Sequence, residues 1–165
     1  MYRMLCRQRL INFGILFIPE GKYKISKTIY IPTAIRLIGY GKNRPEFILA
    51  KNSPGFQEEV ADDIGKAKYM FWFTGAVVKE GEKPRDAGAS TFYSAMSNIN
   101  LRIEDGNPHA VALRTHFAQH SFISYVAVYI GKGKAGLFDV GNEKTLLFTG
   151  EIMAFIRQKP LPDGR

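Results

Sequence analysis

The sequence predicts an all-β fold, an incomplete right-handed, single-stranded parallel β-helix. Short apolar runs rich in Ile recur along the chain, with Gly, Pro, Asn and Asp between them and no long amphipathic helix. Two of these runs also share one sequence frame, at an offset typical of stacked repeats. A β-sandwich is the alternative that this pattern leaves open.

The composition indicates a folded chain and limits the kinds of partner that we expect it to bind. Its 165 residues fit one domain, and 45% of them are hydrophobic, which is enough to bury a core. The formal charge of +8 favours acidic partners such as uronic-acid polymers. The basic residues are scattered and form no nucleic-acid-binding motif, so we expect no nucleic-acid partner. No segment has the apolar length of a membrane span, so we expect no membrane partner.

The compartment stays unknown from the sequence. Arg3, Arg7 and Arg9 precede the apolar stretch Leu10–Ile18, as in a signal peptide, but no small-residue cleavage site follows. The single cysteine, Cys6, excludes an internal disulfide framework and a cysteine-rich metal site. It does not exclude export, because many exported domains lack disulfides.

The apolar runs are expected to be strands, each ended by turn residues. They are Ile15–Ile18, Thr28–Ile31, Ile35–Ile38, Phe47–Ala50, Met70–Phe73, Ile99–Ile103, Phe122–Ile130 and Leu146–Phe148. The segment from Gln57 to Ala89 breaks this rhythm. We interpret it as two surface excursions around one buried strand, and long loops on a regular scaffold are where binding residues usually lie.

The repeated frame predicts how the strands stack. Ser97–Ile103 and Ser124–Ile130 both read Ser-x-apolar-x-apolar-x-Ile, and their offset (124 minus 97) is 27 residues. Because side chains alternate along a strand, the apolar positions of one run should point inward, beneath those of the other. The residues expected to point outward are Asn100, Arg102, Ala127 and Tyr129.

The first rungs carry a recognisable motif. Ile15–Pro32 followed by Ile35–Gly41 gives an apolar strand, Pro-x-Gly-x-Tyr, a second strand and Leu-x-Gly-x-Gly, in that order. This resembles the opening rungs of the pectate lyase superfamily, most closely its rhamnogalacturonase and epimerase-like branch, and also the N-terminal part of exo-β-1,3-glucanases. Further segments look like later rungs of bacterial members: Tyr69–Phe73, Thr91–Asn100, Glu104–Pro108, Arg114–Ser121 and Phe138–Glu143.

Each residue of the motif has an expected physical role. Pro19 can end a strand where no ladder donor is needed. Gly21 is expected to adopt a backbone conformation closed to larger residues, and Tyr23 to offer a large apolar face to the first core layer.

The resemblance implies a domain division and a function. Residues 14–165 would form a partial β-helix domain with an irregular insertion at about 57–89, after an atypical segment, 1–13, that lacks the family's Ala-rich capping helix. Members continue for more rungs, so we expect a fragment that self-associates through uncapped ends. Members act on polysaccharides, usually outside the cytoplasm.

We therefore expect a carbohydrate-active protein of the glycoside hydrolase or polysaccharide lyase type. Its partner would be a polysaccharide, possibly acidic, with no cofactor. We expect the isolated chain to be inactive, and the alternative is a non-catalytic polysaccharide-binding or structural fragment.

The candidate catalytic residues are Asp139 and Glu143, because cleavage of a sugar linkage needs acid and base groups across the ring. They have equal parity, and Gly141 and Asn142 lie between them. A turn held by Asp and Asn side chains is the structural alternative.

The candidate substrate-binding residues lie mostly around a rung corner. His116 and His120 have a spacing seen in metal sites, but Phe-Ala-Gln separates them, so we expect hydrogen-bonded histidines and no metal. Outward arginines and exposed Tyr125 or Tyr129 could hold an anionic sugar. The expected substrate-binding set is Arg114, His116, Gln119, His120 and Asn142.

One further motif, Gly131–Gly136, matches G-x-G-x-x-G after an apolar run. A dinucleotide site needs a helix to follow this motif, and the sequence after it is interrupted by Gly. We interpret it as a turn between rungs.

Overall fold

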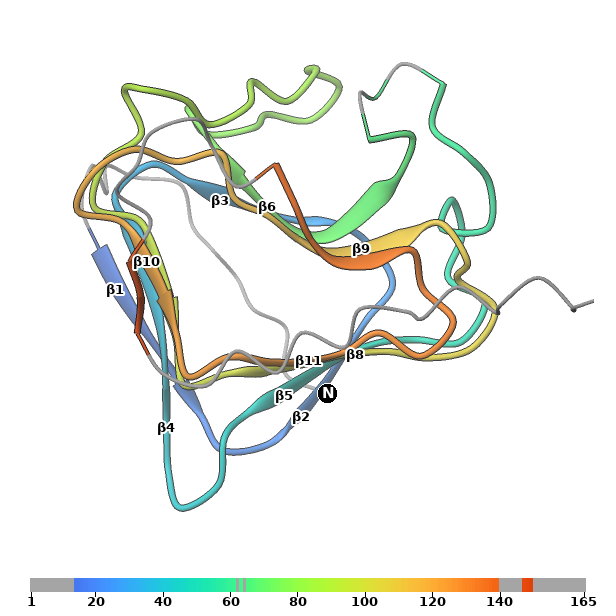
Figure 1. The fold of residues 1–165 in the computed structure, drawn as a ribbon, viewed down its shortest axis with the longest axis horizontal. Coiled ribbons are helices and arrows are strands. Elements are labelled where there is room, and N and C mark those ends of the chain that lie inside the picture. Colours follow the sequence, from blue (N-terminus) through green and yellow to red (C-terminus); the bar gives the residue numbers. More distant parts are fainter. Residues whose placement is uncertain (1–13, 62, 64, 140–146, 150–165) are drawn as a thin grey trace, which may run out of the picture.

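The computed structural model describes residues 14–61, 63, 65–139 and 147–149, and in them the chain is a parallel β-helix. It winds through three parallel sheets in turn, here named A, B and C, and returns to sheet A one rung further on (Figure 1). Sheet A contains β1 (Gly14–Pro19), β4 (Ile35–Tyr40), β7 (Ala95–Ser97), β10 (Phe122–Ser124) and β13 (Leu147–Thr149).

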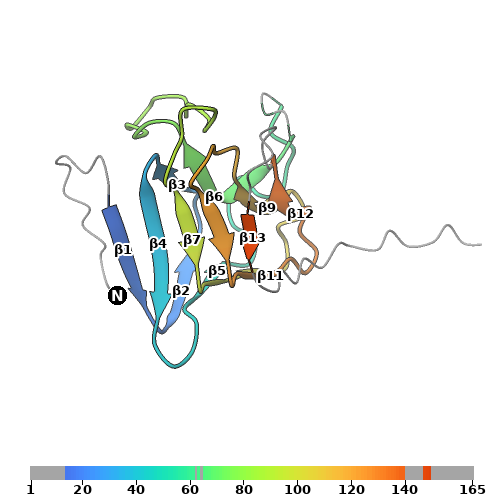
Figure 2. The ribbon, with the colours of Figure 1, turned by 60° about the vertical axis from the view of Figure 1, so that its left-hand side comes forward.

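Sheets B and C have the same regular order. Sheet B contains β2 (Lys22–Ile25), β5 (Glu46–Leu49), β8 (Asn100–Ile103) and β11 (Ala127–Tyr129). Sheet C contains β3 (Ile29–Pro32), β6 (Lys68–Thr74), β9 (Ala110–Arg114) and β12 (Ala135–Phe138). Figure 2 shows the strands of sheet A side by side. The predicted fold class is therefore confirmed.

The three sheets enclose one apolar core, and the repeated frame stacks as predicted. Leu101 pairs in register with Val128, and both side chains are buried. Val126 and Ile130 are only 2% and 5% exposed, as an inward position requires. The same offset of 27 residues brings the Ser97 and Ser124 hydroxyls to 2.8 Å.

A tight corner joins sheet A to sheet B in these rungs. Asn98 and Tyr125 each have a left-handed backbone there, with φ of 57° and 50°. Phe122–Ile130 was expected to be one strand, and this is wrong: Tyr125 and Val126 separate β10 from β11 in two different sheets. β2, β7, β9 and β12 were not expected as strands.

The glycines of the opening motif differ in their roles. A side-chain carbon at Gly39 would lie 2.0 Å from the carbonyl oxygen of Asn98 on the next rung, so only glycine fits there. Gly21 was expected to need a special conformation, but its φ is not positive and the nearest atoms to an added carbon, on Tyr23, are 3.5 Å away. Tyr23 does face the core and stacks on Phe47, with ring centroids 5.1 Å apart.

Two long connections flank β6. The first excursion, residues 50–67, leads from β5 into β6, and the second excursion, residues 75–94, leads from β6 to β7. Both lie beside sheet C (Figure 1). In the part of the chain that the structure describes, no helix is long and apolar enough to cross a membrane.

Candidate active site on the outer face of sheet C

A column of large side chains lines the outer face of sheet C. In-register pairing aligns Tyr30 with Trp72, Trp72 with Arg114, and Arg114 with Phe138. The Arg114 guanidinium carbon lies 4.5 Å from the Trp72 ring centroid and 5.6 Å from that of Phe138. These distances are typical of cation–π contacts, so Arg114 is held between aromatic rings.

The Arg114 side chain is only 4% exposed and forms ion pairs with three aspartates. Asp63, on the first excursion, lies 2.6 Å from Nη1, and Asp86, on the second excursion, lies 2.7 Å from Nη2. Asp139, directly after β12, lies 3.7 Å from Nη2. One guanidinium therefore connects both excursions to the next rung.

The charge of Arg114 is secured by its partners. Burial alone acts to lower the pKa of Arg114, but the hydrogen bond with Asp86 and the neighbouring carboxylates outweigh this effect and raise it. The guanidinium is thus a permanent cation beneath the carboxylates.

Asp63 is the least exposed of the three aspartates around Arg114. Its carboxylate accepts hydrogen bonds from the Tyr69 hydroxyl at 2.5 Å and from the backbone N–H of Gly65 at 2.8 Å. Burial and the hydrogen bond to Asp63 raise the pKa of Tyr69, so the phenol stays protonated. With its side chain 9% exposed, Asp63 has a structural role.

Three further side chains near Arg114 are partly open to solvent. Those of Asp86, His116 and Asp139 are 30%, 31% and 26% exposed. Nδ1 of His116 lies 2.7 Å from Oδ1 of Asp139. Oδ1 of Asp86 accepts the indole N–H of Trp72 at 2.6 Å. One potential ligand atom from each of the three lies within 4.8 Å of the others. We name these three residues the Asp86–His116–Asp139 cluster.

The cluster can perform acid–base chemistry. Two carboxylates and an imidazole are the side-chain types that most often act as general acids and bases. Asp139 has a left-handed backbone with φ of 55°, a conformation that is uncommon for residues with side chains and is concentrated at functional sites.

The cluster also has metal-binding residue types. However, Nη2 of Arg114 lies 2.7 Å from Asp86 and 3.7 Å from Asp139, so the guanidinium takes the place beside both carboxylates where a cation would lie. The arrangement fits Arg114 as the counter-ion better than a metal. The absence of a metal stays a prediction.

The structure brings together only some of the predicted site residues. Asp139 and His116 meet in the cluster. Arg114 is buried between the rungs and its aspartate partners, and its expected role as a substrate ligand stays a prediction. Glu143 and Asn142 lie outside the described residues.

His120 and Gln119 both follow β9, and their expected contact with sugar stays a prediction. The His120 ring stacks on Tyr93, with centroids 5.2 Å apart and the planes at 12°. Gln119 is half-buried in the connection between β9 and β10.

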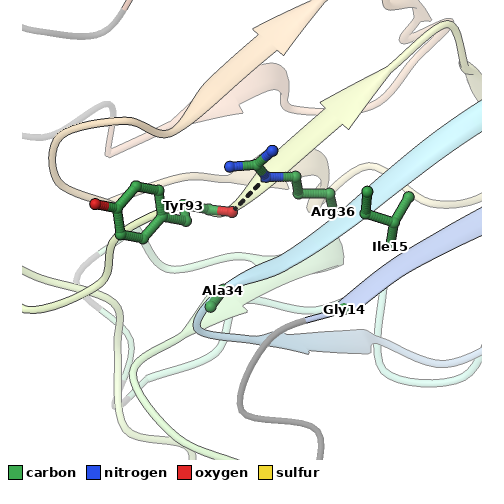
Figure 3. Close-up of a pocket in the computed structure, with 5 residues that line it drawn as sticks. All are labelled: Gly14, Ile15, Ala34, Arg36 and Tyr93. Carbon is green, nitrogen blue, oxygen red and sulfur yellow. Dashed lines mark hydrogen bonds between the residues drawn. The ribbon is translucent and has the colours of Figure 1, made fainter.

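Tyr93 also lines the larger of two surface hollows. This hollow has a volume of about 500 Å³ and lies at the start of β1 and β4 (Figure 3). Arg36 donates from Nε to the Tyr93 carbonyl oxygen at 3.1 Å. Because none of the described residues that line this hollow is acidic, acid–base chemistry is better supported by the cluster on sheet C.

The sequence reasoning missed Asp63 and Asp86 as site residues. Both lie in the acidic and charged excursions that flank the buried strand Tyr69–Phe73, which was the available signal. Their meeting point is Arg114, and its position next to Trp72 follows from the pairing of β6 with β9. Because β9 was not expected as a strand, this register could not be predicted.

Comparison with known families gives one match. The model of the family described as rhamnogalacturonase A/epimerase, pectate lyase-like, matches residues 1–152. That range includes all three members of the Asp86–His116–Asp139 cluster and the strands that carry them. No curated protein and no solved structure matches the chain.

Proposed function

Because the chain belongs to the pectate lyase-like family of rhamnogalacturonase A and epimerase, we propose that it is a carbohydrate-active β-helix protein of the glycoside hydrolase or polysaccharide lyase type. The observation that carries this proposal is the Asp86–His116–Asp139 cluster on the outer face of sheet C. A fold by itself does not determine which reaction a protein catalyses, so the proposed chemistry depends on this cluster.

The cluster lies where a polymer can reach it. Its three side chains are each about one quarter to one third exposed, whereas the side chains of Arg114 and Asp63 beneath them are 4% and 9% exposed. Tyr30, 37% exposed, lies along the same face, and aromatic rings are common stacking partners of sugars.

The roles follow from the contacts. Asp139 orients the His116 ring through Nδ1, which leaves Nε2 for proton transfer. Asp86 provides the second carboxylate, held by Trp72 and Arg114. Arg114 acts as a positioning residue that fixes the carboxylates. Glu143 remains a catalytic candidate only because of its sequence spacing from Asp139.

The test is incubation of the purified chain with polygalacturonate, rhamnogalacturonan and β-glucans. Hydrolysis would release reducing ends, and elimination would in addition give unsaturated-uronate absorbance. Product from any of these polymers would overturn the expectation that the isolated chain is inactive, and Asp139→Asn and His116→Gln should then each lower the rate by about 100-fold or more, the usual contribution of general acid–base catalysis.

The matched control is Glu80→Gln, which removes an exposed carboxylate on the second excursion. It should retain wild-type activity. Activity that survives both Asp139→Asn and His116→Gln would contradict the assignment of the cluster.

A second candidate function is non-catalytic polysaccharide binding. It is favoured by the way Asp86 is engaged, because one of its oxygens accepts from Nε and Nη2 of Arg114 and the other from Trp72. A carboxylate so occupied can be purely structural. Binding of a polymer without any product would support this alternative, and neither binding nor product with any of the polymers would overturn both.

A further inference from the structure

The outer face of sheet B presents two arginines stacked on tyrosines. The guanidinium carbon of Arg102 lies 4.4 Å from the Tyr129 ring centroid, and that of Arg44 lies 6.0 Å from the Tyr125 ring centroid. Arg102 and Tyr129 are register neighbours on β8 and β11, and Tyr125 forms the corner just before β11. The two stacks therefore lie on neighbouring parts of one surface.

Both guanidinium groups are oriented by a second contact. Nε of Arg102 donates to Glu46 at 2.8 Å, and Nε of Arg44 donates to the Asn98 side-chain oxygen at 3.1 Å. Among the residues that the structure describes, neither arginine has a hydrogen-bond partner for its terminal nitrogens. Arg102 is 43% exposed and Arg44 is exposed, so two donor forks face solvent.

A groove of about 380 Å³ lies at the first of these forks. Its lining includes Lys51 and Tyr129 beside Arg102, and also two acidic residues, Glu104 and Asp105. On the same face, the exposed Lys24 belongs to the register column of Ile48, Arg102 and Tyr129. The surface thus combines oriented cations, aromatic rings and a few hydrogen-bond acceptors.

We propose that this face is a binding site for a carboxylate-bearing polysaccharide, separate from the Asp86–His116–Asp139 cluster on sheet C. A guanidinium fork matches a planar carboxylate with two parallel hydrogen bonds. Tyrosine faces suit pyranose rings, and carboxylates such as Glu104 can accept from sugar hydroxyls. Two forks on neighbouring parts of the face suit a polymer that repeats its carboxylates.

A nucleic acid is the other anionic polymer that such a face could attract. Its dense phosphates would be repelled by Glu46, Glu104 and Asp105, which lie among the cations. The face therefore favours a polymer that combines carboxylates with hydroxyls.

The experiment is calorimetric titration of the whole chain with oligogalacturonate and with the same oligomer fully methyl-esterified. We expect the esterified form to bind at least tenfold more weakly. Arg102→Lys keeps the charge and removes the fork, so we expect a roughly fivefold loss of affinity, and a larger loss when Arg44→Lys is added. Circular dichroism of each variant checks that the fold is retained.

Two controls separate this site from other effects. Lys79→Gln removes an exposed positive charge on the second excursion and should leave affinity unchanged. The second control repeats Arg102→Lys in an Asp139→Asn background, where affinity should fall by the same factor, so the result does not depend on the proposed catalytic site.

Three outcomes would overturn the proposal. The first is equal affinity for the free and the esterified oligomers. The second is wild-type affinity in the Arg102→Lys Arg44→Lys double variant. The third is a single-stranded oligonucleotide that binds through the same arginines more tightly than oligogalacturonate does.

Discussion

At the scale of single residues, Tyr69 and Arg114 link stability to protonation. The Tyr69 hydroxyl donates to Asp63 and also lies 3.2 Å from Nη1 of Arg114. Burial and the Asp63 hydrogen bond raise the pKa of Tyr69 above the value of about 10 that it has in the unfolded chain. This stabilisation is complete below about pH 10 and is lost as the pH rises from there towards the folded-state pKa.

Tyr69→Phe should therefore have a pH-dependent effect. At neutral pH we expect it to lower the free energy of unfolding by about 1.5 kcal/mol, because a buried hydrogen bond to a carboxylate is lost. Above about pH 10 the difference from the wild type should shrink, because only the wild type must keep the phenol protonated in order to fold. Urea unfolding at several pH values measures this, and a difference independent of pH would contradict it. Tyr40→Phe removes an exposed phenol, so above about pH 10 its free energy of unfolding should fall as that of the wild type does.

At the scale of elements, the sequence predicts how two alternating runs stack, but it misses β9 and β12. The runs after Ser97 and Ser124 alternate between core and surface, so both their stacking and their inward positions were predictable. All five residues of β9 are buried, because the core covers one face and the excursions cover the other. β12 contains Gly136, which is typical of a turn. The positions of Asp63 and Asp86 beside Arg114 depend on tertiary contacts that no local sequence pattern encodes.

The corner at Asn98 offers a direct test of how sheet A turns into sheet B. Its side chain donates to the Gly39 carbonyl at 2.9 Å and accepts from Nε of Arg44 at 3.1 Å, while its backbone is left-handed. We expect Asn98→Ala to lower the free energy of unfolding by roughly 2–3 kcal/mol, because it loses both contacts and strains the backbone.

Asn98→Gly separates the two causes, because glycine relieves the backbone strain without restoring the contacts. It should therefore cost less than Asn98→Ala in the same urea unfolding experiment. Equal stability of the alanine variant and the wild type would show that the corner is not under this constraint.

At the scale of the whole molecule, the first rung leaves apolar surface uncovered. Ile15, Leu16 and Phe17 of β1 are 56%, 40% and 60% exposed. Among the described strands, β1 pairs only with β4, and no described strand covers its other edge. The net charge of +8 opposes association, but at physiological salt it is screened within about 8 Å.

We therefore expect the chain to associate reversibly through this rung. Light scattering after size exclusion, over a range of concentrations, should show a rising mass. Phe17→Lys should move this rise to concentrations at least tenfold higher, because a charge on an edge strand blocks pairing.

Val77→Lys is the matched control, because Val77 is 59% exposed on the second excursion and not on a strand edge. It should associate as the wild type does. A monomeric wild type at all concentrations would show that β1 is not an association surface.

The contrast between the tight corners and the long excursions bears on how new specificities can be built on this scaffold. The corners at Asn98 and Tyr125 are equally short in their two rungs, whereas the connections on both sides of sheet C vary in length from rung to rung. Loop exchange should thus be tolerated around sheet C without changing the strand register. Arg114 adds a condition, because it binds an aspartate from each excursion. A transplanted first excursion without its aspartate would remove one of the carboxylates that neutralise this buried guanidinium, so the two excursions are best exchanged together.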